Sequence, residues 1–284
     1  MTKVFLDYTQ EELDRAYDQR NWAQNIDATI GLYGSESAAA RAALTHSTHA
    51  YGPTADEVLD FFPAALAGAP TQIFIHGGSW RTLSKNESAA AAPMFIGAGA
   101  NYVALNFSTI PTVRIPDMVA QVRRAIVWIW RHAAELKIDS NALYISGHSS
   151  GGHLCGVVLT TDWAALGAPA NLVKGGTALS GMYEMIPVML SSRREFVKLS
   201  EAEVGELSAM RHLDRINCPV IVGHGAGESP EFQRQSNEFA AALRRIGRLQ
   251  EQFVFAGLDH FTAPQEMNRR ETPLAQAILR QMGL

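Results

Sequence analysis

Short apolar runs, rich in β-branched and aromatic residues, recur along the chain and predict a buried β-sheet. Continuous runs of this length are typical of strands that are covered on both faces. The predicted strands are Glu57–Phe62, Gln72–His76, Tyr102–Phe107, Ala142–Ser146, Pro219–Gly223 and Glu251–Phe255.

Helical patterns alternate with these runs. One helix begins at Pro116 and Asp117 and ends near Lys137, and another begins at Ser229–Pro230 and ends at Gly247. The alternation predicts an α/β fold with right-handed crossovers and a mostly parallel sheet of about eight strands, flanked by helices. In such a sheet, ligands bind beyond the carboxyl ends of the strands. We therefore look for the chemistry just after each predicted strand.

Two segments extend this predicted single domain, which spans residues 1–284. Residues 1–45 predict an N-terminal helical extension, with a helix in Glu11–Trp22 lying outside the core. Residues 182–212 are polar and charged between two predicted strands, and they predict a small helical cap over the strand ends. The alternative is a solvated pair of surface helices. No internal repeat, low-complexity segment or Pro/Ser-rich linker divides the chain.

Composition narrows the class of protein. Hydrophobic residues make up 47% of the chain and charged residues 18%, which is enough for a large core. The net charge of −4, without a basic run, argues against nucleic-acid binding. Cys155 and Cys218 are the only cysteines and lie far apart in sequence, so we expect a reduced, cytoplasmic protein without a disulfide framework. The acidic N-terminus does not resemble a signal peptide.

The uncharged stretch Ser88–Val113 is long enough to span a bilayer. It contains two prolines and changes from a helical to a strand-like period near Gly99. A buried helix followed by a buried strand explains it better, so we expect no membrane association. The partner is predicted to be a small-molecule substrate, and a homodimer is left open.

A serine stands where one predicted strand passes into a helix. Gly147, Ser149 and Gly151 form G-x-S-x-G, the sharp turn that exposes a nucleophilic serine above a sheet. Earlier in the chain, His76 is followed by Gly77 and Gly78 at another strand end, where uncovered amides can form an oxyanion hole. The second part of the oxyanion hole is then the amide of Ser150, the residue after the nucleophile.

A general base and an orienting carboxylate should follow the serine in that order. His260 comes after the last predicted strand and is the predicted base, while His148 and His153 should point away from the serine hydroxyl. Glu228 lies in the loop after the strand ending at Gly223 and is the predicted carboxylate. Glu231, already inside the next helix, is the first alternative. Asp214 and Glu184 are further alternatives.

Together these residues resemble the α/β-hydrolase superfamily and, within it, the kynurenine formamidase (arylformamidase) group. The resemblance rests on HGGSW from His76, GHSSGGHL from Gly147, ESPEFQRQS from Glu228, the pair Asp259–His260 and the N-terminal helix around Tyr17. It implies a triad of Ser149, Glu228 and His260. Two features depart from the group. The acid is Glu rather than Asp, and Asn106–Pro111, which should line the pocket, is not the sequence usual after that strand.

The leading hypothesis is a serine hydrolase, without cofactor or metal, that cleaves a small amide or an aryl formamide such as N-formylkynurenine through an acyl-enzyme. Its alternatives are a carboxylesterase for small acyl or aryl esters and, more remotely, a non-catalytic ligand-binding protein. A metallohydrolase is disfavoured because His, Cys and carboxylate residues do not occur at metal-ligand spacing. The residues expected to bind the substrate are Ser79, Trp80, Phe107 and Tyr183.

Overall fold

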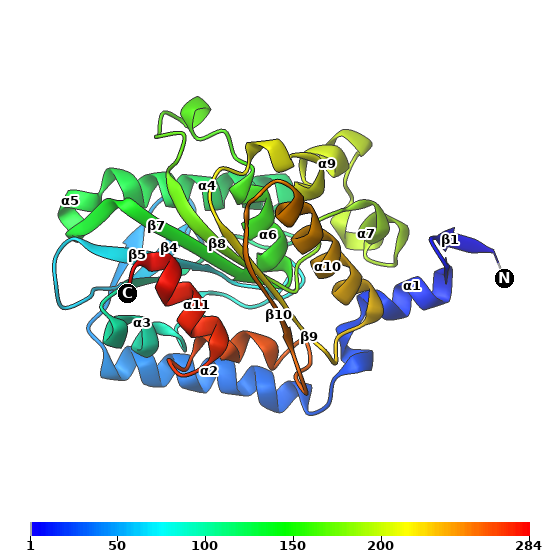
Figure 1. Ribbon diagram of the computed structural model, residues 1–284, viewed down its shortest axis with the longest axis horizontal. Coiled ribbons are helices and arrows are strands. Elements are labelled where there is room, and N and C mark those ends of the chain that lie inside the picture. The colour runs from blue at the N-terminus through cyan, green and yellow to red at the C-terminus, as the bar shows by residue number, and fades with distance from the viewer. Residues whose placement is uncertain (1) are drawn as a thin grey trace.

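A computed structural model describes residues 2–284, in which an eight-stranded sheet lies between two layers of helices (Figure 1). The strand order is β10-β9-β8-β7-β5-β6-β4-β3, and every neighbouring pair from β10 to β6 is parallel. Only β4 and β3, at one edge, run antiparallel to their neighbours. The predicted mostly parallel sheet is therefore confirmed. The strands are β3 Ser47–Ala50, β4 Val58–Phe62, β5 Ala69–Ile75, β6 Asn101–Leu105, β7 Ile138–His148, β8 Val173–Leu179, β9 Val220–Gly225 and β10 Leu249–Phe255.

All six strands predicted from the sequence are present, and two more complete the sheet. One of these, β8, was not predicted because Lys174, Gly175 and Gly176 interrupt its apolar run. It lies near the centre of the sheet, where the glycines bring the backbone close to packed side chains. A Cβ on Gly176 would come within 2.8 Å of Leu159 in the helix above.

The register of the parallel strands gathers their carboxyl ends at one place. Ile75, the last residue of β5, lies opposite Gly147 of β7. His148 in turn lies opposite Leu179 of β8, and Leu179 lies opposite Gly223 of β9. The loops that follow four neighbouring strands therefore begin side by side, as expected for a ligand site in this type of sheet.

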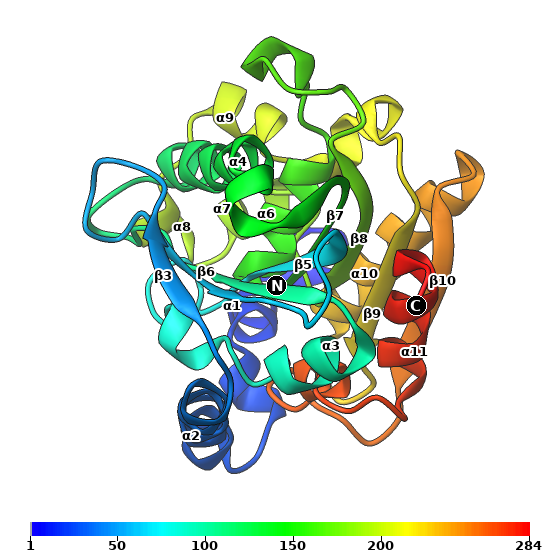
Figure 2. The same ribbon diagram turned by 90° about the vertical axis from the view of Figure 1, so that its left-hand side faces the viewer.

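Helices cover both faces of the sheet (Figure 2). The core on one face is formed with α4, α6 and α10, and the core on the other with α2, α3 and α11. Every residue of α6 is buried, because the helix is made of small and apolar residues and packs directly against the central strands. The bounds are α2 Ile26–Ala43, α3 Ala92–Ala98, α4 Ile115–Arg131, α5 Ala133–Leu136, α6 Ser150–Leu159, α10 Pro230–Arg245 and α11 Pro273–Met282.

The first helix of the N-terminal segment packs into the core, in contrast to the prediction that it lies outside. A short hairpin, β1 Lys3–Phe5 and β2 Tyr8–Thr9, leads into α1 Gln10–Tyr17. Leu13 is 0% exposed and Tyr17 2%, and the Tyr17 ring meets Phe232 of α10 edge-on at 5.8 Å. The helix is amphipathic, and the neighbouring segments cover its apolar side. Figure 1 shows α1 beside α7 and α10.

Residues 182–212 form three short helices, α7 Ile186–Leu190, α8 Arg194–Val197 and α9 Glu201–Glu206, next to α1. The side-chain amide of Gln10 donates to the carbonyl of Leu190 at 2.9 Å, which joins the two segments. Among residues 2–284, no helix is both long enough and apolar enough to cross a bilayer.

The burial of α1 gives a first testable prediction. Replacing Leu13 with Ala should lower the free energy of unfolding by about 2–5 kcal/mol, because it leaves a cavity in the core. Urea denaturation measures this change. Leu6→Ala is the matched control, because Leu6 is 60% exposed and its loss should change stability by less than about 0.5 kcal/mol. Equal, small effects of both substitutions would show that α1 does not belong to the cooperative core.

Candidate active site

Ser149 stands at the turn between β7 and α6 in a strained backbone conformation, with φ 57° and ψ −123°. Its amide donates to Leu179 and its carbonyl accepts from His153, both at 3.0 Å, which fixes the turn. Gly147 and Gly151 allow the close approach of backbones around it. A Cβ on Gly147 would lie 2.1 Å from the carbonyl oxygen of Gly151, so no larger residue fits.

Ser149, His260 and Glu228 form one continuous hydrogen-bonded chain. The distance between Nε2 of His260 and Oγ of Ser149 is 2.8 Å, and that between Nδ1 of His260 and Oε2 of Glu228 is 3.1 Å. Because a carboxylate only accepts, Nδ1 carries the proton and Nε2 offers its lone pair to the serine hydroxyl. All three side chains are buried, with exposures of 2–6%.

The second oxygen of Glu228 is held independently of the histidine. Oε1 accepts hydrogen bonds from Oγ of Ser180 at 2.5 Å and from the amide of Gly225 at 2.7 Å. Ser180 follows β8 directly, and Gly225 is the last residue of β9. Two strand ends thus fix the longer side chain of a glutamate, and Oε2 remains free to face His260.

The alternative carboxylates lie elsewhere. Glu231 is fully buried, forms an ion pair with Arg234 at 2.7 Å and accepts from the hydroxyl of Tyr17 at 3.1 Å. Glu184 pairs with Arg211 at 2.9 Å in the 182–212 segment. Asp214 lies in a short 3-10 turn after that segment. Of the four candidates, only Glu228 contacts the imidazole.

The loop after β5 lies against the serine. A Cβ on Gly77 would come within 3.2 Å of the Cβ of Ser149, so the backbone of this glycine runs directly beside the hydroxyl-bearing side chain. Gly78, Ser79 and Trp80 all have positive φ, at 97°, 53° and 60°.

A hydrogen bond ties this loop to the start of α6, because the amide of Trp80 donates to Oγ of Ser150 at 3.1 Å. The amide of Ser150 is the first of α6 and has no partner inside the helix. The three predicted oxyanion residues, Gly77, Gly78 and Ser150, are therefore gathered around Ser149.

A cleft of about 410 Å³ opens beside Ser149 and His260. Ser79, one of the residues expected to bind the substrate, lines it together with Gly78. Much of the remaining wall comes from residues that the sequence analysis did not single out. These residues are Asp18, Gln19, Arg20, Asp27 and Ile30 of the N-terminal segment, Arg193 of the 182–212 segment, and Phe261.

The aromatic residues predicted to line the pocket do not do so. Trp80 is 1% exposed and donates its indole N–H to Nδ1 of His153 at 3.2 Å, inside the core. Phe107 stacks on His76, with ring centres 4.1 Å apart. Tyr183 is fully buried. The predicted substrate role is thus wrong for these three residues, because all of them are turned inward to fill the core.

The segment 106–111, which departs from the related group, also lies behind the site. Asn106 accepts from the amide of Lys85 at 3.1 Å and donates to the carbonyl of Asp56 at 2.9 Å. The amide of Ile110 donates to the carbonyl of Trp80 at 2.8 Å. This segment supports the loop after β5 from outside the cleft, so its unusual sequence does not shape the wall of the cleft.

His148 does not point away from the site as predicted. Its ring centre lies 4.6 Å from that of His260, and it lines the same cleft as Ser149. Burial holds the pKa of His148 well below its ordinary value. Burial also lowers the pKa values of His76 and His153 to about 4. All three imidazoles are therefore neutral at pH 7.

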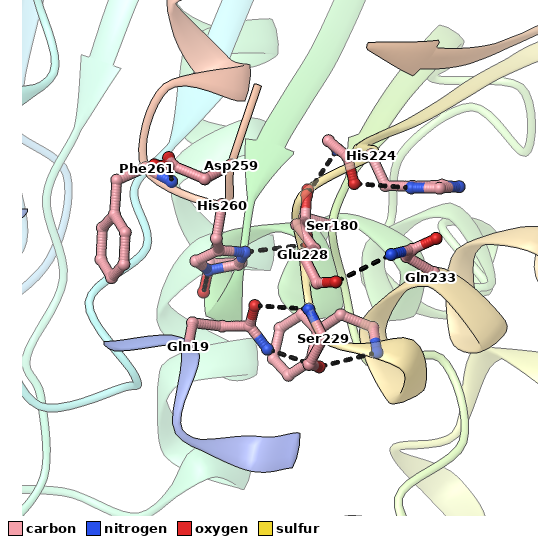
Figure 3. Close-up of polar contacts among 12 residues, drawn as sticks. Gln19, Ser180, His224, Glu228, Ser229, Gln233, Asp259, His260 and Phe261 are labelled. Carbon is pink, nitrogen blue, oxygen red and sulfur yellow. Dashed lines mark hydrogen bonds and ion pairs between the residues drawn. The ribbon is translucent and has the colours of Figure 1, made fainter. Parts of the chain in front are cut away.

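Gln19 connects the N-terminal segment to the carboxylate loop. Its Nε2 donates to Oγ of Ser229 at 2.7 Å, and its Oε1 accepts from the amide of Ser229 at 3.1 Å. Figure 3 shows Gln19 reaching Ser229, the residue next to Glu228, close to His260. An isolated polar residue in a polar segment gives no signal for this role. The sequence offered nothing to single out Gln19.

Among residues 2–284, no group of three or more His, Cys, Asp or Glu side chains is arranged to hold a metal ion. The arrangement instead provides a hydroxyl, an imidazole, a carboxylate and adjacent backbone amides. Such a set of groups is suited to nucleophilic attack on a carbonyl carbon.

Comparisons with known proteins agree with this fold and chemistry. The chain is 28% identical to a kynurenine formamidase of Salmo salar, over 98% of both chains. It is 29% identical to that of Danio rerio, over 97% of both chains. A crystal structure of a candidate thioesterase from Silicibacter sp. TM1040 has the same fold, with a TM-score of 0.82 and 21% identity, and covers 94% of this chain and 98% of its own.

The protein is thus a hydrolase of the α/β-hydrolase superfamily, and its likeness to kynurenine formamidases, anticipated from the sequence motifs, is confirmed. The model of the prolyl oligopeptidase family matches residues 121–282, and the chain belongs to that family. The BD-FAE model matches residues 59–166, which include β5 and the loop that follows it.

The buried neutral histidines predict how stability depends on pH. Because folding lowers the pKa values of His76, His148 and His153, the unfolded chain binds more protons below its histidine pKa near 6.5. The free energy of unfolding should therefore fall as the pH drops from about 6.5 to 5, by up to roughly 1.4 kcal/mol per pH unit for each histidine. Urea titrations at several pH values measure this slope.

His153→Asn tests whether the buried histidines cause this pH dependence. Because the substitution removes one titrating imidazole, the free energy of unfolding should change less steeply with pH. Two carboxylates, Glu12 and Glu203, have pKa values lowered from 4.5 to about 2. Their contribution to stability is therefore lost at a lower pH than that of the histidines. Stability that stayed constant between pH 6.5 and 5 would contradict the neutral state of these imidazoles.

Proposed function

We propose that this protein is a serine hydrolase that removes the formyl group from an aryl formamide through an acyl-enzyme intermediate. Ser149 is the nucleophile, His260 the general base and Glu228 the orienting carboxylate. The observation that carries this proposal is the unbroken hydrogen-bonded chain from Oγ of Ser149 to Oε2 of Glu228, at 2.8 and 3.1 Å.

The first step uses this chain directly. His260 takes the proton from the Ser149 hydroxyl as Oγ attacks the carbonyl carbon of the substrate. The imidazolium that forms is stabilised by Glu228, whose second oxygen is already held by Ser180 and Gly225. His260 then gives its proton to the leaving amine, and a water molecule releases the acyl group by the reverse sequence.

The negative charge that develops on the carbonyl oxygen is accepted by backbone amides. The proposed donors belong to Gly77, Gly78 and Ser150, which the strained loop and the first turn of α6 bring around Ser149. Each correctly placed donor contributes on the order of 3 kcal/mol to the transition state. The hydrogen bond from the amide of Trp80 to Oγ of Ser150 holds the loop after β5 and the first turn of α6 in position relative to each other.

Two observations favour a formyl group over a longer acyl group. Ser149 is only 6% exposed and the backbone of Gly77 lies against it, so the acyl side has little free space. The likeness to kynurenine formamidases also extends over almost the whole chain. The 410 Å³ cleft then accommodates the larger amine portion of the substrate, between the N-terminal segment and the proposed cap of residues 182–212.

The carboxylate assignment can be tested with two isosteric substitutions. Glu228→Gln should lower kcat by about three to four orders of magnitude, because a neutral amide neither fixes the imidazole tautomer nor stabilises its cation. Steady-state kinetics on an aryl formamide or ester measure this loss. Glu231→Gln, which disrupts the ion pair with Arg234, should lower the melting temperature but leave kcat of the folded protein within about tenfold. The opposite pattern would assign the carboxylate to Glu231.

Acyl preference separates a formamidase from a carboxylesterase, since the same triad serves both. We expect kcat/KM for formanilide to exceed that for acetanilide by at least about 100-fold, and hydrolysis of 4-nitrophenyl butyrate to be slow. Ser149→Ala should abolish all of these activities and so provides the background control. A clear preference for the butyryl ester, with no turnover of formanilide, would make the protein a carboxylesterase.

A further inference from the structure

A buried positive charge, Arg193, lies in the wall of the catalytic cleft. Its side chain comes from the start of α8 and lines the same cavity as Ser149 and His260, although the residue is only 8% exposed. Arg193 lies in the charged run SSRREF of the predicted cap, and the sequence does not distinguish it from the neighbouring charged residues.

The guanidinium of Arg193 is only partly satisfied by the protein. Its Nε and Nη2 donate to the carbonyl oxygen of Tyr17 at 3.1 and 2.6 Å, and Nη1 contacts the sulfur of Met182 at 3.4 Å. A guanidinium has five N–H donors, and a thioether is a weak acceptor. No carboxylate of residues 2–284 forms an ion pair with it within 4.0 Å.

Arg193 keeps its charge in this environment. Burial lowers its pKa to about 10, so the side chain is still protonated at pH 7. The rings of Tyr17, Trp80 and Phe232 surround the guanidinium, with centres 5.4–5.7 Å from Cζ. These rings fix its position but bring no negative charge. The Asp18 carboxylate acts on this charge only from beyond ion-pair distance and raises the pKa of Arg193 less than burial lowers it. A buried cation without a direct anionic partner is costly, and an anion entering the cleft would offset that cost.

The other charged residues of the cleft already have partners at its rim. Arg20 and Asp27 lie 3.6 Å apart in a solvent-exposed pair. Asp18 accepts from the amide of Arg20 at 3.1 Å and thereby caps a 3-10 turn. Arg193 is therefore the charge in the cleft that is best placed to bind an anion.

We propose that Arg193 determines substrate specificity by binding a carboxylate on the amine portion of the substrate. This inference rests on the proposed function, because a formyl group carries no second charge and the anion must then belong to the leaving amine. A guanidinium binds a carboxylate through parallel hydrogen bonds, which fixes orientation as well as position. The anchored carboxylate would hold the amide carbonyl toward Ser149 and the oxyanion loop.

The test compares a charged and a neutral substrate of the same shape. The ratio of kcat/KM for 2-formamidobenzoate to kcat/KM for formanilide is measured in the wild type and in variants. Arg193→Gln should lower this ratio about 10- to 100-fold, mainly through KM of the charged substrate, because a charge-assisted contact is lost. Arg193→Lys keeps the charge and should retain a larger share of the ratio. Arg194→Gln, at the adjacent exposed position, should leave the ratio unchanged.

A purely structural role would give a different result. If Arg193 only joined the cap to Tyr17, Arg193→Gln would lower kcat/KM for both substrates equally and leave the ratio unchanged. That outcome, with Arg193→Lys behaving the same way, would overturn the inference.

Direct binding separates this inference from the proposed function. Calorimetric titration with 2-aminobenzoate and with aniline requires no turnover and can use Ser149→Ala as the parent protein. Tighter binding of 2-aminobenzoate, weakened at least tenfold by Arg193→Gln but not by Arg194→Gln, supports carboxylate binding even if formamides are not hydrolysed. Equal affinity for 2-aminobenzoate in all variants would refute it, whatever the reaction catalysed.

Discussion

The site depends on how closely three backbone segments approach one another around Ser149. The turn after β7, the loop after β5 and the first turn of α6 are packed so tightly that a Cβ at Gly147 or Gly151 would overlap backbone atoms at 2.1 Å. This packing holds Ser149 in a conformation that costs about 1–3 kcal/mol. The surrounding sheet supplies that energy, because the buried parallel strands on both sides cannot move apart without exposing the core. The backbone of the loop after β5 thereby lies directly against the Ser149 side chain.

Residues distant in sequence complete the site around this rigid centre. Glu228 is held by two strand ends, His260 by the loop after β10, and the loop next to Glu228 by Gln19 of the N-terminal segment. Arg193 joins the 182–212 segment to Tyr17. The proposed reacting groups are therefore built on the sheet, whereas much of the cleft wall comes from the turn after α1, from α2 and from Arg193 beside α8. This division allows substrate preference to change without altering the reacting groups.

The sequence predicted the sheet, and the meeting of Ser149, His260 and Glu228, better than the cleft wall. Strands such as β6 and β9 are nearly uninterrupted apolar runs, and Ser149, His260 and Glu228 follow strand ends in a fixed order that few other residues match. Prediction failed where a residue's direction depends on tertiary packing. Trp80 lies two residues after Gly78, but its backbone at φ 60° places the indole in the core. Gln19 and Arg193 lie in polar segments, and only folding brings them to the cleft. The local sequence pattern does not show that the indole of Trp80 turns inward or that Gln19 and Arg193 line the cleft.

The pairing of Gln19 with Ser229 also has a consequence for synthesis of the chain. These two residues are 210 positions apart, so the ribosome needs roughly 10 to 40 s at 5–20 residues per second to make the second after the first. During that interval Leu13 and Tyr17 have no α10 to pack against, and their apolar side chains remain exposed to water. The nascent N-terminal segment is consequently a site at which chaperones can bind, and the cleft can close only after the last third of the chain has emerged.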